Sequence, residues 1–182
     1  MLRKFIAKDA NMPVIQFSNP ARDLAKVTQY SLKVLQDIMS VSGVPRVIIT
    51  STARTPAEQA RIMFENIERH GIDHQKRLYG NYGDRVIDHY LILKQSGKSR
   101  SEIITGMTAK IYQLGPGKVS RHVGDPLKLN VVDIAPSSIE VPRRAVFEDA
   151  IKNEARVSRF LLPPGDPAYH LEIPQPQQGA DS

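Results

Sequence analysis

The sequence predicts an α+β fold in which a small sheet packs on helices. Apolar residues recur at helical spacing over several long segments, whereas short β-branched runs occur at only a few places. The strands and helices do not alternate regularly, which argues against a parallel α/β sheet. The chain has 182 residues, 41% of them hydrophobic, enough for one aliphatic core. We therefore expect a single domain over residues 1–173 and a disordered tail, 174–182, rich in Pro and Gln.

The N-terminal part contains one helix and one strand. Residues 1–19 show little periodicity and predict an irregular arm or a short edge strand. An apolar stripe at helical spacing covers residues 21–40, and Gly43 and Pro45 end that helix. Residues 47–50 are β-branched and predict a buried strand.

The strand leads directly into a second helix. Thr55 suits an N-cap, Pro56 the first helical position, and Glu58 completes a capping box. This helix should reach about His70, and the polar, Gly-rich residues 71–84 predict a loop. Further helices are predicted at 85–96, 101–113 and 142–155, and further strands at 131–134, 160–162 and 168–173.

Composition limits the chemistry. The chain lacks Cys, so disulfides and thiolate metal sites are excluded, and a metal must be held by His, Asp or Glu. No apolar run is long enough to span a membrane, and the N-terminus does not resemble a secretory signal, so we expect synthesis in the cytoplasm. The net charge of +6 favours an anionic partner. Its basic residues are scattered, without an aromatic-interleaved stripe, which argues against nucleic acid.

Two segments carry candidate metal ligands. Asp133 lies within an apolar strand, where an unpaired carboxylate is costly, and His122 precedes it. On the last strand, His170 and Glu172 share a face because residues two apart point the same way. Two His and one Asp can hold zinc and leave one position open for water, whose proton a carboxylate accepts. A purely structural explanation stays open, in which His122 is a loop histidine, Asp133 caps a helix or turn, and His170 is a core histidine.

Arg54 is a third candidate, because it follows a buried strand and precedes a helix N-terminus. A guanidinium there can clamp a substrate carboxylate or stabilise an oxyanion. It can equally be a structural Arg paired with an acid.

Three segments in this order resemble the zinc D-alanyl-D-alanine peptidases, a group that includes VanY-like carboxypeptidases and phage L-alanyl-D-glutamate endopeptidases. Residues 51–59, STARTPAEQ, match S-x-x-R-[ST]-x-x-x-Q. Residues 120–122, SRH, are continued by Asp133, and His170 lies on a final strand. The resemblance covers about residues 46–173.

This resemblance implies a small antiparallel sheet packed against helices, as in the Hedgehog/DD-peptidase fold. It implies that His122, Asp133 and His170 bind Zn²⁺ and that Arg54 stabilises a substrate carbonyl or carboxylate. Gln59 and Ser120 would be secondary substrate-binding or supporting residues. The implied substrate is a peptidoglycan stem peptide, and the absence of a signal together with the basic charge suits a phage endolysin that acts on the cell wall after release. We expect a monomer.

The chain departs from the family pattern twice. The spacing from His122 to Asp133 is eleven residues, longer than in the family, which makes Asp125 a competing ligand. Because Pro126 makes Asp125 a turn residue, we prefer Asp133. The family's catalytic base is a Glu three residues before the last His, where this chain has Pro167. We expect Glu172 to be the base, with Asp166 second.

Two other classes of function compete with the peptidase. The first is a non-catalytic metal-binding structural or virion protein of the same fold, and the second is a basic nucleic-acid-binding protein.

Overall fold

The computed structural model describes residues 12–177, which form an α+β protein. Their contacts group the chain into two compact units. One consists of residues up to Thr52 and from Pro126 onward and contains the sheet; the other, Ala53–Asp125, is helical. The sequence predicts a single domain over residues 1–173, and this remains a prediction. Within the described residues no helix is long and apolar enough to cross a membrane.

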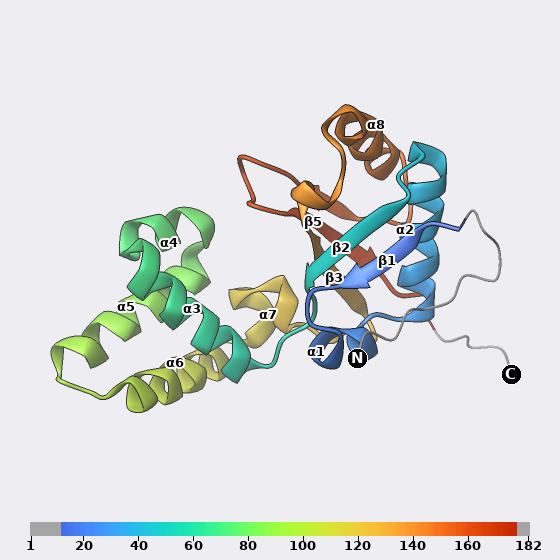
Figure 1. Cartoon of the computed structure of the whole chain (residues 1–182). Helices are drawn as coiled ribbons and strands as arrows, with labels where there is room; N and C mark the ends of the chain where they lie inside the picture. Colours follow the sequence, from blue (N-terminus) through green and yellow to red (C-terminus); the bar gives the residue numbers. More distant parts are fainter. Residues whose placement is uncertain (1–11, 178–182) are drawn as a thin grey trace, which may run out of the picture. The chain divides into compact units, whose positions relative to one another are not determined.

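The sheet unit contains five strands in the order β1-β2-β3-β5-β4 (Figure 1). β2 and β3, β3 and β5, and β5 and β4 pair antiparallel, but β1 and β2 pair parallel. The expected antiparallel sheet is therefore wrong, and the sheet is mixed. Helical crossover residues between β1 and β2 return the chain to the same end of the sheet, which parallel pairing requires. The strands are β1 (Val14–Phe17), β2 (Arg46–Ser51), β3 (Leu129–Ile134), β4 (Arg159–Leu161) and β5 (Tyr169–Pro174).

One face of this sheet carries the core. Val47 and Ile49 of β2, Val132 of β3 and Leu171 of β5 are buried in a cluster with residues of two helices. These helices are α2 (Gln29–Ser42) and α8 (Val141–Lys152). Because strand residues alternate between faces, the residues between these core positions point away from α2 and α8. The unit also contains α1 (Pro20–Asp23), η1 (Leu24–Lys26) and η3 (Pro136–Ser138).

The helix predicted at 21–40 is interrupted. Val27 has an extended backbone, and Thr28 caps α2 by accepting a hydrogen bond from the Ser31 amide. A side-chain oxygen that satisfies a free helical N–H favours a new helix start over a continuous helix. The stripe that the sequence predicts thus belongs to α2 and to the short helices before it.

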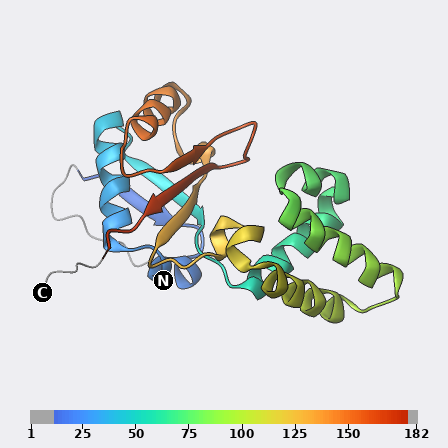
Figure 2. The ribbon, with the colours of Figure 1, turned by 180° about the vertical axis from the view of Figure 1, so that it is seen from behind.

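The helical unit, drawn in green to yellow in Figures 1 and 2, has a hydrophobic core of its own. The capping box at Thr55 and Glu58 is present as predicted, and the helix it starts ends at His70. The loop predicted at 71–84 is wrong, because this segment forms a short helix and the start of the next. Ile72 and Tyr79 of this segment pack against the core of the helical unit, although most of its side chains are polar. The helices are α3 (Pro56–His70), α4 (Ile72–Leu78), α5 (Asn81–Gln95), α6 (Arg100–Leu114), α7 (Pro116–Val119) and η2 (Arg121–Val123).

The chain is ordered further than the predicted tail suggests. Pro174 is the last residue of β5, and the Gln175 amide donates to the Lys128 carbonyl at 2.9 Å. The Gln175 side chain also donates to Ser31 at 2.9 Å. Residues 178–182, like the N-terminal residues 1–11, lie outside the described part of the chain.

Candidate metal centre

Asp133 and His170 meet because their strands are in register. Asp133 on β3 lies directly opposite His170 on β5, on the face that points away from α2 and α8. Residues opposite each other in an antiparallel pair have neighbouring side chains. The His170 Nδ1 atom lies 2.9 Å from Asp133 Oδ1. An ionised carboxylate only accepts hydrogen bonds, so Nδ1 is the donor.

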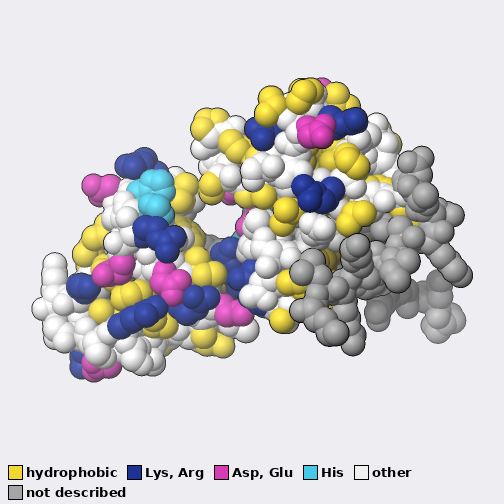
Figure 3. Space-filling view, in the orientation of Figure 1, with side chains coloured by type: hydrophobic (Ala, Val, Ile, Leu, Met, Phe, Trp, Pro, Cys, Tyr) yellow, Lys and Arg dark blue, Asp and Glu magenta, His cyan; other side chains and the backbone are white. Residues whose placement is uncertain are grey.

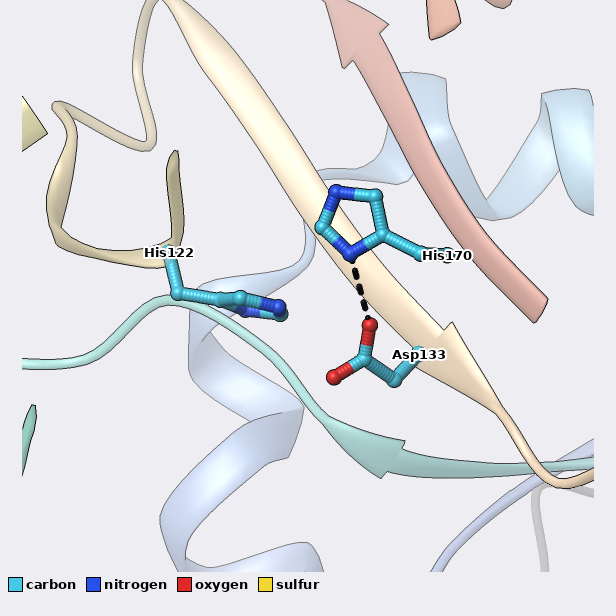
Figure 4. Close-up of side chains that lie close together, drawn as sticks. All are labelled: His122, Asp133 and His170. Carbon is cyan, nitrogen blue, oxygen red and sulfur yellow. Dashed lines mark hydrogen bonds and ion pairs between the residues drawn. The ribbon is translucent and has the colours of Figure 1, made fainter. Parts of the chain in front are cut away.

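His122 completes a group of three potential ligands. Its side chain is buried, in the 3₁₀ turn η2. His122, Asp133 and His170 each offer one ligand atom, and these atoms all lie within 4.8 Å of one another. Figure 4 shows the three side chains pointing toward a common centre. Two imidazoles and one carboxylate converging in this way can hold a metal ion.

The competing ligand, Asp125, is not part of this group. It is exposed, whereas His122 and His170 are 6% and 7% exposed. The choice of Asp133 over Asp125 agrees with this arrangement. Asp133 belongs to the group because it lies opposite His170 on the neighbouring strand, and this pairing cannot be deduced from the sequence spacing to His122.

Glu172 lies on the other side of the His170 ring. Its Oε1 atom is 3.5 Å from His170 Nε2, and Arg159 on the neighbouring strand lies 3.8 Å away from the same oxygen. The Glu172 residue is 1% exposed. His170 is thus flanked by Asp133 at one nitrogen and by Glu172 at the other. The sequence indicates the shared face of His170 and Glu172 but not the role of Arg159, which is paired with Glu172 only through strand register.

The pKa of His170 is raised above its ordinary value. Burial has the largest single effect and lowers this pKa, but the hydrogen bond to Asp133 and the neighbouring carboxylate charges together outweigh burial. These charges are those of Asp133, Asp166 and Glu172. Asp166 is partly buried, and its Oδ1 accepts a hydrogen bond from the Ala168 amide at 2.9 Å. Three carboxylates therefore act on one imidazole, and such a field favours any cation at this place.

Arg54 is linked to His122 through the backbone. The Arg54 amide donates to the His122 carbonyl at 2.7 Å, and its Nη1 donates to Gln59 Oε1 at 3.0 Å. Gln59, one of the two predicted supporting residues, therefore contacts Arg54 directly. Ser120, the other, directly precedes η2, and its carbonyl accepts a hydrogen bond from the Val123 amide. Tyr79 was not among the predicted site residues, and its hydroxyl accepts a hydrogen bond from Gln59 Nε2 at 2.7 Å. A contact over twenty residues leaves no local signal.

Charges on the helical unit are of both signs. On the face that Figure 3 shows, basic and acidic side chains are interspersed over the helices. Several are paired at the surface, among them Arg61 with Glu65, Lys94 with Glu68, and Lys98 with Glu102. This view contains no continuous basic stripe of the kind that tracks a phosphate backbone.

No family model, curated protein or solved structure matches the chain.

Proposed function

We propose that this chain is a zinc-dependent peptidase that hydrolyses amide bonds in peptidoglycan stem peptides, as phage lytic proteins do. The observation that carries the proposal is the convergence of His122, Asp133 and His170, with their ligand atoms within 4.8 Å. Two imidazoles and one carboxylate suit a catalytic zinc site with an open position. Mg²⁺ and Ca²⁺ prefer oxygen ligands, so the two histidines favour zinc. The choice of peptidoglycan rests on the family resemblance.

The residues around the ligands have separate tasks in this proposal. A bound zinc ion would supply Lewis acidity and lower the pKa of a water molecule. His170 would offer the nitrogen that faces Asp133, and its other nitrogen lies beside Glu172. Metal-ligating histidines commonly donate their second N–H to a carboxylate, which holds the ring in place. Glu172 therefore suits the orientation of His170.

The general base is then assigned to Asp166, the second candidate from the sequence. Its charge acts on His170, and its bond to the Ala168 amide holds the carboxylate in a defined place. Asp166 would accept a proton from the attacking water. Glu172, the base expected from the sequence, is the alternative, and the roles of base and orienting carboxylate give different kinetics when the residue is replaced. Replacement of a base lowers kcat, whereas replacement of an orienting carboxylate weakens zinc binding about 10- to 100-fold.

Arg54 would meet the developing negative charge or the carboxylate of the substrate. Its amide bond to the His122 carbonyl connects its backbone directly to that of a ligand residue. A guanidinium can bind a carboxylate through two parallel hydrogen bonds. Ser120 and Gln59 support these two segments.

Digestion of purified sacculi tests this function. Protein loaded with one equivalent of zinc should release peptides whose masses identify the bond cut, and so separate carboxypeptidase from endopeptidase action. Asp133→Asn and His170→Ala should abolish release. His70→Ala is the matched control, because His70 is exposed and lies outside the ligand group. Release that persists in Asp133→Asn would overturn the mechanism.

One alternative is distinguished by the same samples. A metal-binding structural or virion protein would bind one equivalent of zinc, lose it in His170→Ala, and release no peptide from any sacculus preparation. The geometry of the three ligands supports this alternative equally as far as metal binding goes. Asp166, whose charge acts on His170 and which can serve as a base, favours the catalytic assignment.

A further inference from the structure

A buried amide connects Arg54 to a tyrosine in the helical unit. Gln59 is fully buried in the second turn of α3. Its Oε1 accepts from Arg54 Nη1 at 3.0 Å, and its Nε2 donates to the Tyr79 hydroxyl at 2.7 Å. An amide has one acceptor end and one donor end, and a guanidinium can only donate. The amide must therefore keep its oxygen toward Arg54, and the Tyr79 oxygen stabilises that orientation.

Tyr79 is itself held by a glycine. A Cβ atom on Gly83, in the first turn of α5, would lie 2.5 Å from the Tyr79 Cβ and 2.7 Å from its ring Cδ1. Gly83 is buried, so the two residues have no room to separate without moving a helix. The position of the Tyr79 ring thus depends on the absence of a side chain at Gly83.

The start of α3 restrains the backbone next to Arg54, at the opposite side of Gln59 from Tyr79. Thr55 and Glu58 form a capping box, which determines where the helix begins relative to Arg54. The Gln59 amide donates to the Thr55 carbonyl at 2.9 Å. Arg54 itself is bound through its backbone to His122. Its guanidinium is therefore directed by Gln59 from a backbone that is already restrained.

We propose that Tyr79 and Gln59 are positioning residues that hold the Arg54 guanidinium in place to bind a carboxylate or oxyanion of a peptide substrate. The identity of the bound anion as part of a peptide substrate rests on the proposed function, whereas the restraint on Arg54 is a property of the protein without substrate. A guanidinium that is oriented before binding loses less conformational entropy when it meets its anion. Tyr79→Phe removes the hydroxyl acceptor and keeps the ring, so the amide loses the partner that sets its orientation.

The restraint is measured first without substrate. In ¹⁵N–¹H spectra, the Nε–Hε signal of Arg54 is identified by its loss in Arg54→Lys. Tyr79→Phe should shift and broaden this signal, whereas Tyr112→Phe, at an exposed tyrosine of the same unit, should leave it unchanged. An Arg54 signal that is the same in Tyr79→Phe as in the wild type overturns the proposal.

A pair of substitutions at Gln59 separates positioning from packing. Gln59→Glu keeps an acceptor toward Arg54 and should retain a narrow Arg54 signal. Gln59→Leu occupies a similar volume without an acceptor and should broaden it. A merely structural role for Gln59 would predict the opposite order, because Leu is the easier residue to bury. Gly83→Ala should reproduce the Tyr79→Phe spectrum if the fold, checked by circular dichroism, is retained.

Kinetics connect the restraint to the substrate. With zinc-loaded protein and a purified muropeptide, Tyr79→Phe should raise KM about fivefold, the size of one neutral hydrogen bond, while zinc affinity stays at the wild-type value. An unchanged KM beside a broadened Arg54 signal would overturn the link to the substrate. If the wild type cleaves no muropeptide, the proposed function fails, whereas the spectra still decide whether Tyr79 and Gln59 hold Arg54.

Discussion

His170 Nδ1 lies 2.9 Å from Asp133 Oδ1, across a pair of strands that places the two residues directly opposite each other. The same imidazole has Glu172 3.5 Å from its other nitrogen. Asp133 and His170 together form a preorganised pair of ligands, to which the turn η2 adds His122.

Zinc should stabilise the folded protein through this group. A ligand that binds only the native state at about 100 times its Kd adds about 2.7 kcal/mol to the free energy of unfolding. Thermal unfolding of protein stripped with a chelator and then reloaded should therefore show a higher Tm with zinc. The increase should vanish in His122→Ala and in His170→Ala and persist in His70→Ala. An equal increase in all four proteins would place the metal elsewhere.

The stability of metal-free protein should fall as the pH rises through the pKa of His170. The folded-state pKa is raised above the ordinary value of 6.5, because the hydrogen bond to Asp133 and the charges of Asp133, Asp166 and Glu172 together outweigh burial, the largest single effect. A raised pKa means that the folded state holds its proton more tightly. The stabilisation is complete below about 6.5 and is lost as the pH passes the folded-state value. Urea unfolding over this range checks the sign, and NMR titration of His170 locates the window.

Asp133→Asn is the control for this pH dependence. An amide lacks the charge that raises the His170 pKa, so the slope of stability against pH should become smaller. A slope that is identical in Asp133→Asn and in the wild type would assign the dependence to other groups.

Thr55→Ala should destabilise the helical unit by about 1 kcal/mol, because the Thr55 side chain caps α3 within a complete capping box. Ser99→Ala should cost a similar amount, since Ser99 forms the same motif at the start of α6. Chemical denaturation measures both. If Thr55→Ala also broadens the Arg54 signal and Ser99→Ala does not, the cap of α3 contributes to the position of Arg54 as well as to stability.

Asp23→Ala should cost about 3 kcal/mol, because it removes a buried carboxylate from its partners. Asp23 is fully buried, accepts from Thr52 Oγ1 at 2.7 Å, and binds the Arg22 guanidinium at 2.6 and 2.8 Å. Asp88→Ala, which removes a surface pair with Lys76, should cost less than about 1 kcal/mol. Equal losses in the two variants would contradict the importance of burial at Asp23.

Local signals predicted much of the fold. The capping box at Thr55 and the strands β2 and β5 each depend on neighbouring residues, and the structure contains all three. The segment 71–84 was not predictable in this way. Its helices expose mostly polar side chains, and they are held by contacts such as that of Tyr79 with Gln59, twenty residues apart.

The sequence by itself determined which residue types were available: no thiols, five histidines, and an acid in an apolar strand that required a partner. It also determined that His170 and Glu172 share a face, because strand geometry has a period of two. Only the tertiary structure decided that Asp133 faces His170, that Glu172 lies at the other ring nitrogen, and that Tyr79 supports Gln59. Strand register and helix packing depend on the whole core, and no local pattern encodes which distant residues they bring together.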